Sequence, residues 1–292
     1  MSPERPLTGR VALITGAGRG IGRAHARALA QMGTTVVVND IGAGPDGTGY
    51  DPAVAESVVA EIESEGGRAF PDATDIASLD RGRLAVRSVI ERCGRIDILV
   101  NNAGFASGGG TLEQPDIEGI DALLQVHLWG ALGTMSAAFA DMRARRWGRI
   151  VNTVSEVALD ARFAGSLGYG AAKAALWSAT LTAAAEGAGL GITVNAVSPG
   201  ARTRLNADLL DTGFRDGSSA DVDLDPRHVA RLVAYLASDE AATVTGRVIH
   251  AAGGQIREYT TSRTSRSELV HQIRSGMDRL PIHPAISANT DW

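Results

Sequence analysis

The chain has 292 residues, 44% hydrophobic and 21% charged, and this ordinary globular composition excludes a collagen, a coiled coil and a chain disordered throughout. Its net charge of −5 lacks the basic excess that nucleic-acid-binding proteins show. No apolar run approaches the ~20 residues of a membrane helix, and the polar first ten residues contain no signal-peptide core. The single cysteine, Cys93, fits a reducing compartment. We therefore expect a soluble cytoplasmic protein without nucleic-acid or membrane partners.

Short apolar runs alternate with helical patterns along the chain. Strands are expected at residues 11–15, 35–39, 68–70, 96–100, 149–154, 192–197 and 248–250. Helices are expected at residues 21–32, 54–65, 79–92, 117–145, 167–186 and 226–237. Strands that alternate with long helices form a parallel sheet covered on both faces. The pattern predicts one α/β domain over residues 1–255, a Rossmann-type doubly wound parallel sheet of about seven strands with helices on both faces. Residues 256–292 lie outside the alternation and are expected to form a tail or an arm that packs on a neighbouring subunit.

A glycine-rich segment, Thr15-Gly-Ala-Gly-Arg-Gly-Ile-Gly22, lies between the first expected strand and the first expected helix. In this setting it is a good dinucleotide-binding fingerprint. The glycines allow a tight turn and a close backbone approach, and the helix start offers N–H groups to a pyrophosphate. We assign Gly16, Arg19, Gly20, Ile21 and Gly22 to this loop.

Asp40 follows the second expected strand, eighteen positions after Gly22. A carboxylate near this offset can accept hydrogen bonds from the adenosine ribose hydroxyls, and it would repel the 2′-phosphate of NADP. Arg19 favours NADP instead, because an arginine could bind its 2′-phosphate. No basic residue follows Asp40 before Arg68. The sequence therefore predicts NAD as the cofactor, and no metal site is expected.

Lysine occurs once in the chain, at Lys173, four residues after Tyr169 on an expected helix. Residues four apart share a helix face. A nearby ammonium favours the phenolate and would lower the tyrosine pKa from its usual value of ~10. Tyr169 could then exchange a proton with a substrate oxygen, and Ser155, after the fifth expected strand, would hydrogen-bond that oxygen.

These segments, together with Asn101-Asn-Ala-Gly104 and Ser198-Pro-Gly200, occur in the order typical of short-chain dehydrogenases/reductases. The chain resembles this family over about residues 8–255. Residues 37–42 and 126–130 further resemble the dehydrogenase unit of multifunctional β-oxidation enzymes and bacterial hydroxysteroid dehydrogenases. The resemblance implies an NAD(P)-dependent oxidoreductase acting on CH–OH groups, in which Lys173 also holds the nicotinamide ribose.

The resemblance also assigns further cofactor contacts. It implies that Asn101, Ala103 and Gly104 line the adenosine side and that Asp72 and Ala73 flank the adenine. It implies that Pro199, Gly200 and Thr203 contact the nicotinamide half.

Two positions depart from the family pattern. His127 stands where the family has an asparagine that holds a water in the proton relay, and a histidine can both donate and accept hydrogen bonds. We expect either this role or a structural histidine bonded to local backbone. Ser155 and Tyr169 are fourteen residues apart, one more than is common in the family, which changes the loop from Glu156 to Gly168.

Apolar residues in the expected pocket segments favour a hydrophobic secondary alcohol or ketone such as a steroid or terpenoid; they are Phe105, Trp129, Leu159, Phe163, Leu205, Leu209, Leu210 and Phe214. Six aspartates between Asp208 and Asp225 disfavour the phosphates of coenzyme A. A 3-hydroxyacyl-CoA or 3-oxoacyl thioester is the alternative substrate. A non-redox relative, such as an epimerase, a dehydratase or a sensor, is the alternative function. The alanine-rich helix at residues 167–186 predicts a homodimer or homotetramer.

Overall fold

The computed structural model describes residues 5–106, 108–158, 166–204, 206 and 223–260. One compact unit runs from Met1 to Tyr259, and Thr260–Trp292 form a second. Apart from Thr260, the second unit lies outside the described residues, so the tail or arm expected there stays a prediction.

The described residues form one sheet of eight strands in the order β3-β2-β1-β4-β5-β6-β7-β8. The strands are β1 Val11–Thr15, β2 Thr35–Asn39, β3 Arg68–Asp72, β4 Ile98–Asn101, β5 Gly148–Thr153, β6 Ile192–Gly200, β7 Val248–Ala252 and β8 Gln255–Tyr259. All pairs are parallel except β7 with β8. The chain order reverses between β1 and β4, and ligands of doubly wound folds bind at this switch point.

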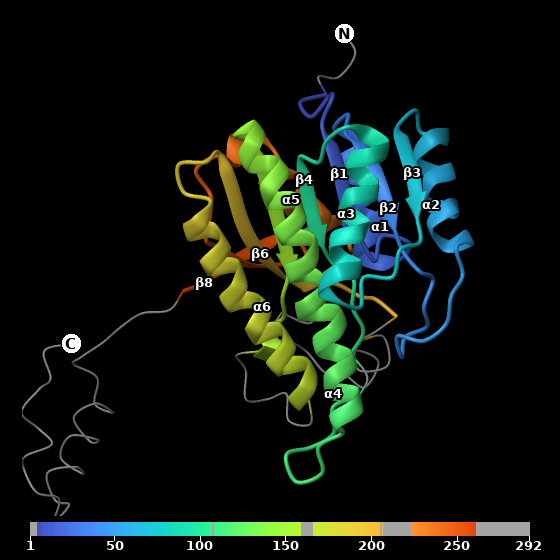
Figure 1. The fold of residues 1–292 in the computed structure, drawn as a ribbon, viewed down its shortest axis with the longest axis vertical. Helices are drawn as coiled ribbons and strands as arrows, with labels where there is room; N and C mark the ends of the chain where they lie inside the picture. Colours follow the sequence, from blue (N-terminus) through green and yellow to red (C-terminus); the bar gives the residue numbers. More distant parts are fainter. Residues whose placement is uncertain (1–4, 107, 159–165, 205, 207–222, 261–292) are drawn as a thin grey trace, which may run out of the picture. The chain divides into compact units, whose positions relative to one another are not determined.

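Helices cover both faces of the sheet (Figure 1). They are α1 Gly20–Gln31, α2 Ala53–Ser64, α3 Leu79–Cys93, α4 Ile117–Leu124, α5 Ala131–Arg145, α6 Leu167–Glu186 and α8 Arg227–Leu236. Helix α1 packs between α2 and α8 on one face, and α3 packs on α5 on the other. The predicted Rossmann-type sheet with two helical layers is confirmed.

The long helix expected at residues 117–145 is interrupted. Between α4 and α5 the residues Gln125–Gly130 form a π-helical segment, η1. Its last residue packs closely on the loop before α3, because a Cβ on Gly130 would lie 2.3 Å from the carbonyl oxygen of Ile76. π-helical segments widen the helix locally and are frequent at functional sites. Here the segment carries His127, which is buried.

Strand β8 lies in a segment that was not expected to join the sheet. It pairs antiparallel with β7, with Val248 opposite Tyr259 and Ala252 opposite Gln255. Gly253 and Gly254, with φ of 52° and 79°, form the two-residue turn between them. Two consecutive residues with positive φ suit the tight hairpin turn of antiparallel strands. The sheet therefore has one strand more than predicted.

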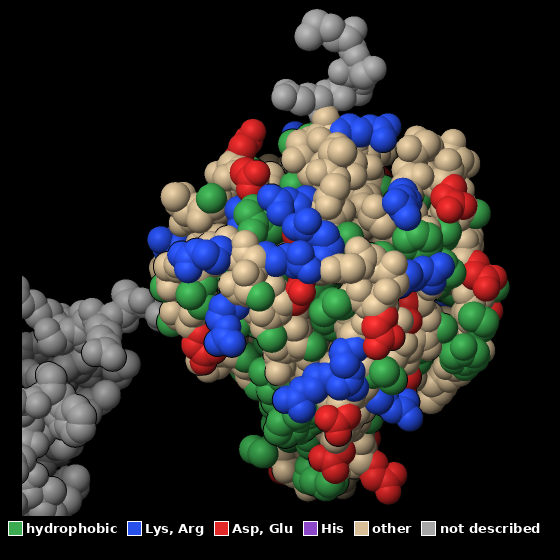
Figure 2. Space-filling view, turned by 45° about the horizontal axis from the view of Figure 1, so that its top comes forward, with side chains coloured by type: hydrophobic (Ala, Val, Ile, Leu, Met, Phe, Trp, Pro, Cys, Tyr) green, Lys and Arg blue, Asp and Glu red, His purple; other side chains and the backbone are tan. Residues whose placement is uncertain are grey.

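The amino ends of the strands carry an arginine cluster, on a face where arginine side chains are widespread (Figure 2). The guanidinium carbon of Arg10 lies 3.7 Å from the ring centre of Trp147, and that of Arg149 lies 4.3 Å from it. Arg149 is buried and donates to the carbonyl oxygen of Ser238 at 3.1 Å. These contacts fix the edge of the sheet opposite the cavity described below. No helix among the described residues has the length and apolar character needed to cross a membrane.

Candidate active site

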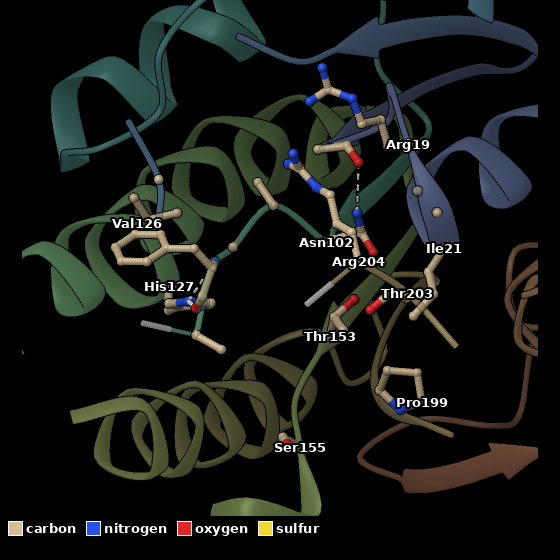
Figure 3. A pocket seen from close by; sticks show the side chains of 18 of the residues that line it. Arg19, Ile21, Asn102, Val126, His127, Thr153, Ser155, Pro199, Thr203 and Arg204 are labelled. Carbon is tan, nitrogen blue, oxygen red and sulfur yellow. Dashed lines mark hydrogen bonds between the residues drawn. The ribbon is translucent and has the colours of Figure 1, made fainter. Parts of the chain in front are cut away.

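A cavity of about 550 Å³ opens at the carboxyl ends of the parallel strands (Figure 3). Loops after β1, β2, β3, β4, β5 and β6 line it, together with η1 and the start of α6. It contains most of the predicted site residues: Gly16, Arg19, Gly20, Ile21, Gly22, Asp40, Ala103, Gly104, His127, Ser155, Tyr169, Lys173, Pro199, Gly200 and Thr203. The topology thus gathers residues from distant parts of the chain at one edge of the sheet.

The glycine loop leaves no room for a side chain at Gly16 or Gly22. A Cβ on Gly22 would lie 2.1 Å from the carbonyl oxygen of Gly16, and one on Gly16 would lie 2.7 Å from the Cα of Ala103. Helix α1 begins at Gly20 without a side-chain cap and without an acidic residue in its first turn. Backbone N–H groups and the positive end of the helix dipole therefore remain available to an anion. The loop fits the pyrophosphate of a dinucleotide.

Asp40 lies beside this loop with both carboxylate oxygens engaged. Oδ2 accepts a hydrogen bond from the backbone N–H of Gly18 at 2.8 Å, and Oδ1 accepts one from Gly42 at 2.7 Å. A carboxylate oxygen can accept more than one hydrogen bond, so each oxygen can still accept one from a ribose hydroxyl. The two backbone bonds fix where the negative charge lies.

Two arginines lie next to Asp40. Arg19 donates to the carbonyl oxygen of Ala43 at 3.1 Å, and Arg204, from the loop after β6, donates to the same oxygen at 2.9 Å. Burial and the charge of Arg19 lower the pKa of Arg204, while Asp40 raises it, which shows how close the three charges lie. Figure 3 places both arginines at one end of the cavity and Ser155 at the other. Sequence reasoning missed Arg204 because it approaches Asp40 from a distant loop.

Ser155, Tyr169 and Lys173 meet at the opposite end of the cavity. The hydroxyl of Ser155 lies beside that of Tyr169 and favours its phenolate, which lowers the tyrosine pKa. Lys173 donates from Nζ to the carbonyl oxygen of Thr153 at 2.6 Å, and Nζ lies 5.6 Å from the centre of the Tyr169 ring. Helix α6 presents Tyr169 and Lys173 on one face, and the end of β5 delivers Ser155.

The pKa values of this group differ from the expectation. Burial raises the pKa of Tyr169 to about 12, and the hydroxyl of Ser155 offsets only part of that rise. Burial likewise lowers the pKa of Lys173 to about 7. The expected lowering of the tyrosine pKa by the lysine is therefore absent here. Burial disfavours the charged form of each group, and this effect outweighs any stabilisation of the phenolate by the ammonium.

His127 is fully inside the protein. Its Nε2 lies 2.8 Å from the carbonyl oxygen of Phe105 and 3.3 Å from the backbone nitrogen of the same residue. Because the contact with the oxygen is the shorter one, we assign the proton to Nε2. Nδ1 is then an acceptor, and it has no hydrogen-bond partner among the described residues. Burial and the charge of Lys173 keep the pKa of His127 well below its usual value, so the ring is neutral. The imidazole contacts Tyr169 edge-on, with ring centres 5.4 Å apart.

The family model for short chain dehydrogenases matches residues 10–212. The chain belongs to the short-chain dehydrogenase/reductase family. A short-chain type dehydrogenase/reductase of Mycobacterium tuberculosis is 38% identical over 248 residues, which cover 85% of this chain and 84% of that protein. The crystal structure of a short chain dehydrogenase from Mycobacterium avium has a TM-score of 0.78 and 37% identity, covering 94% of this chain and 96% of that one.

A 3-oxoacyl-[acyl-carrier-protein] reductase of Thermotoga maritima is 35% identical over 254 residues, 86% of this chain and 99% of the relative. The chain also spans about a third of much longer relatives. A peroxisomal multifunctional enzyme type 2 of Mus musculus is 35% identical over 263 residues, 90% of this chain but 34% of that protein. Membership of the family makes this chain an oxidoreductase that acts on CH–OH groups with a nicotinamide dinucleotide, and the predicted resemblance is confirmed.

Three residues assigned from the family pattern do not line the cavity. Asn101 points from β4 toward α5, where its Oδ1 accepts from Thr134 at 2.7 Å and its Nδ2 donates to Asn152 at 2.9 Å. Side chains alternate along a strand, so its neighbour Asn102 lines the cavity instead and donates to the carbonyl oxygen of Gly16 at 3.0 Å.

Asp72 and Ala73 are likewise outside the lining. The carboxylate of Asp72 accepts from Asn39 at 2.6 Å and from Thr74 at 2.8 Å. Because Asp72 is bonded to the neighbouring strand and to its own loop, the cavity wall comes from residues slightly further along the chain, Thr74, Asp75 and Ile76.

The apolar residues expected in the pocket have different outcomes. Phe105 lines the cavity and is nearly buried. Trp129 does not line it and is 43% exposed, because η1 turns this residue toward the surface. Leu159, Phe163, Leu205, Leu209, Leu210 and Phe214 lie outside the described residues, as does most of the acidic segment before Asp225.

Proposed function

We propose that this member of the family is an NAD-dependent enzyme that moves a hydride between nicotinamide and a hydrophobic secondary alcohol or its ketone. The observation that carries the proposal is that Ser155, Tyr169 and the chain's single lysine line one end of the same cavity, with the buried Nζ of Lys173 5.6 Å from the centre of the Tyr169 ring. Tyr169 and Ser155 would meet the substrate oxygen, and Lys173 would support Tyr169.

The chemistry needs a proton donor or acceptor at the substrate oxygen. Tyr169, protonated at neutral pH, gives its hydroxyl proton to the oxygen of a ketone that is being reduced. For the oxidation of an alcohol it must first lose this proton, and the phenolate then accepts the proton of the alcohol. Ser155 hydrogen-bonds the same oxygen and so fixes its distance from Tyr169. When bound, the nicotinamide supplies or accepts the hydride.

The tyrosine must recover or release its proton after each turnover. We assign this role to Lys173 and His127. Lys173, with a pKa near 7, can hold or release a proton under physiological conditions. Nδ1 of His127 is a buried acceptor without a partner in the described part of the chain, and such an atom costs about 1–3 kcal/mol unless a water or ligand satisfies it. A water between Nδ1 and Lys173 would connect the pair, in the place that the family gives to an asparagine.

The preference for NAD rests on Asp40. Its charge is fixed by two backbone hydrogen bonds at the place where the adenosine ribose of a dinucleotide would lie. A 2′-phosphate there would be repelled by the carboxylate and attracted by Arg19 and Arg204. Both arginines already bond to the carbonyl oxygen of Ala43, so meeting a phosphate would cost them those bonds.

The cavity wall supports a hydrophobic substrate. Phe105, Val126 and Val157 line it near His127 and Ser155. At the described end of the acidic segment Asp223 and Asp225 both pair with Arg227, so any repulsion of coenzyme A phosphates would have to come from the aspartates before them. The alternative, an acyl thioester, is supported by the relative named as a 3-oxoacyl-[acyl-carrier-protein] reductase, which this chain covers almost completely.

A substrate panel tests the proposal. Steroid and terpenoid secondary alcohols, 3-hydroxyacyl-CoA thioesters and the matching ketones are each offered with NAD(H) and NADP(H), and the cofactor absorbance is followed. The proposal expects the highest kcat/KM with an uncharged alcohol and NAD. Turnover confined to thioesters would establish the alternative, and tight cofactor binding without any turnover would favour a sensor.

We also propose a cytoplasmic homodimer or homotetramer. The exposed residues of α6 are Leu167, Ala171, Ala174, Ser178, Leu181, Thr182, Ala185 and Glu186, so the exposed side carries one charge, at the last residue of the helix. Hydrophobic side chains also gather over α4 at the lower end of the view in Figure 2, where Leu112 and Ile117 are exposed. A long helix face whose single charge lies at one end suits close packing against a second copy.

A further inference from the structure

The end of strand β8 packs next to the elements that carry the proposed catalytic residues. The ring of Tyr259 lies 5.7 Å from that of Trp177 and 6.3 Å from that of His250, centre to centre. Trp177 is one helical turn after Lys173 on α6. Tyr259 thus adds a residue from the last described strand to the back of the site.

The hydroxyl of Tyr259 makes polar contacts with two loops of the cavity. It donates to Oε2 of Glu156 at 3.2 Å, and it lies beside Ser198, which lowers the pKa of Tyr259. Glu156 directly follows Ser155, and Ser198 directly precedes Pro199, which lines the cavity. Burial first, and then the charge of Glu156, raise the pKa of Tyr259 to about 12, so the hydroxyl keeps its proton and can donate.

Ser155 itself lies at the start of a single short turn, η2 Glu156–Ala158. Two local bonds hold that turn: Val157 donates from its N–H to Oγ of Ser155 at 3.3 Å, and Ala158 donates to its carbonyl oxygen at 3.2 Å. No residue of the turn is buried. The turn also packs on α6, but with no buried residue it depends in part on contacts from outside, and Tyr259 supplies one of them.

We propose that Tyr259 is a positioning residue, whose hydroxyl links the Ser155 turn to the Ser198–Pro199 strand end and so sets the place of the Ser155 hydroxyl. The inference rests on the proposed function, since it concerns the alignment of Ser155 with Tyr169. It also gives β8 a role in the site, because the hairpin after β7 delivers a tyrosine to the carboxyl end of β5 and β6.

Tyr259→Phe tests the link, because phenylalanine keeps the ring contacts with Trp177 and His250 and removes only the hydroxyl. The matched control is Tyr235→Phe on α8, whose tyrosine is exposed and outside the cavity. We expect Tyr259→Phe to lower kcat about tenfold, with little change in KM, because a small misplacement of Ser155 penalises the reacting geometry. We expect the kcat of Glu156→Gln to stay close to that of wild type, because glutamine keeps an acceptor oxygen for the hydroxyl of Tyr259.

A double-mutant cycle with Glu156→Ala shows whether the two residues act together. If they do, Glu156→Ala and the double variant lose about as much kcat as Tyr259→Phe alone. Additive losses, or wild-type kcat in Tyr259→Phe, would overturn the proposal.

Amide hydrogen exchange read by mass spectrometry gives a test that does not depend on turnover. Exchange in the peptide covering residues 153–158 should quicken about fivefold in Tyr259→Phe and not in Tyr235→Phe. If the wild type turned over no alcohol or ketone, the proposed function would fail, yet this exchange would still decide the role of Tyr259. Unchanged exchange in Tyr259→Phe would contradict it.

Discussion

The ammonium of Lys173, on α6, donates a hydrogen bond of 2.6 Å to the carbonyl oxygen of Thr153, the last residue of β5. Ser155 is two residues further along the same chain segment, and Tyr169 is one turn before Lys173. One buried cation therefore ties together the helix and the strand that supply the two hydroxyl groups of the site. Its burial lowers the lysine pKa to about 7.

The first prediction is a pH dependence of stability. The unfolded chain keeps Lys173 protonated up to its usual pKa of ~10.4, whereas the folded protein loses this proton near pH 7. Between these values the unfolded state binds more protons, so the free energy of unfolding rises with pH, by up to about 1.4 kcal/mol per pH unit. Urea unfolding of wild type and Lys173→Met should show this rise between pH 7 and pH 10 only in wild type. If the free energy of unfolding changed with pH in the same way in both proteins, the lysine pKa would not be lowered.

Lys173→Arg should also lose activity, by about 100-fold or more. Arginine keeps the charge, but its planar fork replaces a compact ammonium whose proton can be released near neutral pH. Steady-state kinetics with the preferred substrate check this, and Arg231→Lys on α8 serves as a control for the reverse exchange. An active Lys173→Arg enzyme would mean that the single lysine has no chemical role.

His127 gives a prediction that separates activity from stability. His127→Asn keeps an acceptor and should remain within about tenfold of wild-type kcat, whereas His127→Leu should lose about 100-fold. Stability should not follow this order, because leucine removes an acceptor that has no partner among the described residues. Kinetics and urea unfolding of both variants provide the comparison. Equal activity of the two variants would mean that His127 is structural.

The cofactor preference depends on Asp40. A 2′-phosphate ~4 Å from the carboxylate would be repelled by up to ~4 kcal/mol, which solvent and the two arginines reduce to ~1–3 kcal/mol. Wild type should therefore prefer NAD by roughly ten- to hundredfold in kcat/KM. Asp40→Ser should narrow the difference in kcat/KM between the two cofactors by raising kcat/KM with NADP. Adding Arg204→Ala should remove part of that increase. Equal use of both cofactors by wild type would show that Asp40 does not face the ribose.

The oligomer is predicted to form through the exposed face of α6. Light scattering should give a multiple of the 30.3 kDa chain mass for wild type. Ser178→Arg introduces a charge in the middle of that face and should shift the protein toward the monomer, whereas Ser57→Arg, on the exposed side of α2, should not. A wild-type mass near 30 kDa would refute the prediction.

Sequence patterns predicted the helices and strands whose apolar residues recur at a regular spacing. Helix α6 begins and ends at the expected residues, Leu167 and Glu186, and β1 and β2 also match. The π-helical segment around His127 was not predicted, because a locally widened helix keeps nearly the same apolar spacing. Strand β8 was missed although its turn glycines, Gly253 and Gly254, gave a usable signal.

The sequence predicted those site residues whose role depends on nearby residues in the chain, and it missed those whose role depends on contacts between distant segments. Tyr169 and Lys173 share a helix face by spacing alone. Arg204 meets Ala43 across 161 positions, a contact that no local pattern encodes. Asn101 and Asn102 differ by one residue along a strand, and that single step decides which of them faces the cavity.

The central claim is that Tyr169 exchanges a proton with the substrate, and Tyr169→Phe tests it most directly. NAD binding is measured by calorimetric titration and turnover by cofactor absorbance, with Tyr235→Phe as the control. Removing one hydroxyl should lower kcat by at least about 100-fold and leave the Kd for NAD within about threefold of wild type, since only the proton-transfer group is lost. Wild-type turnover in Tyr169→Phe would contradict the account.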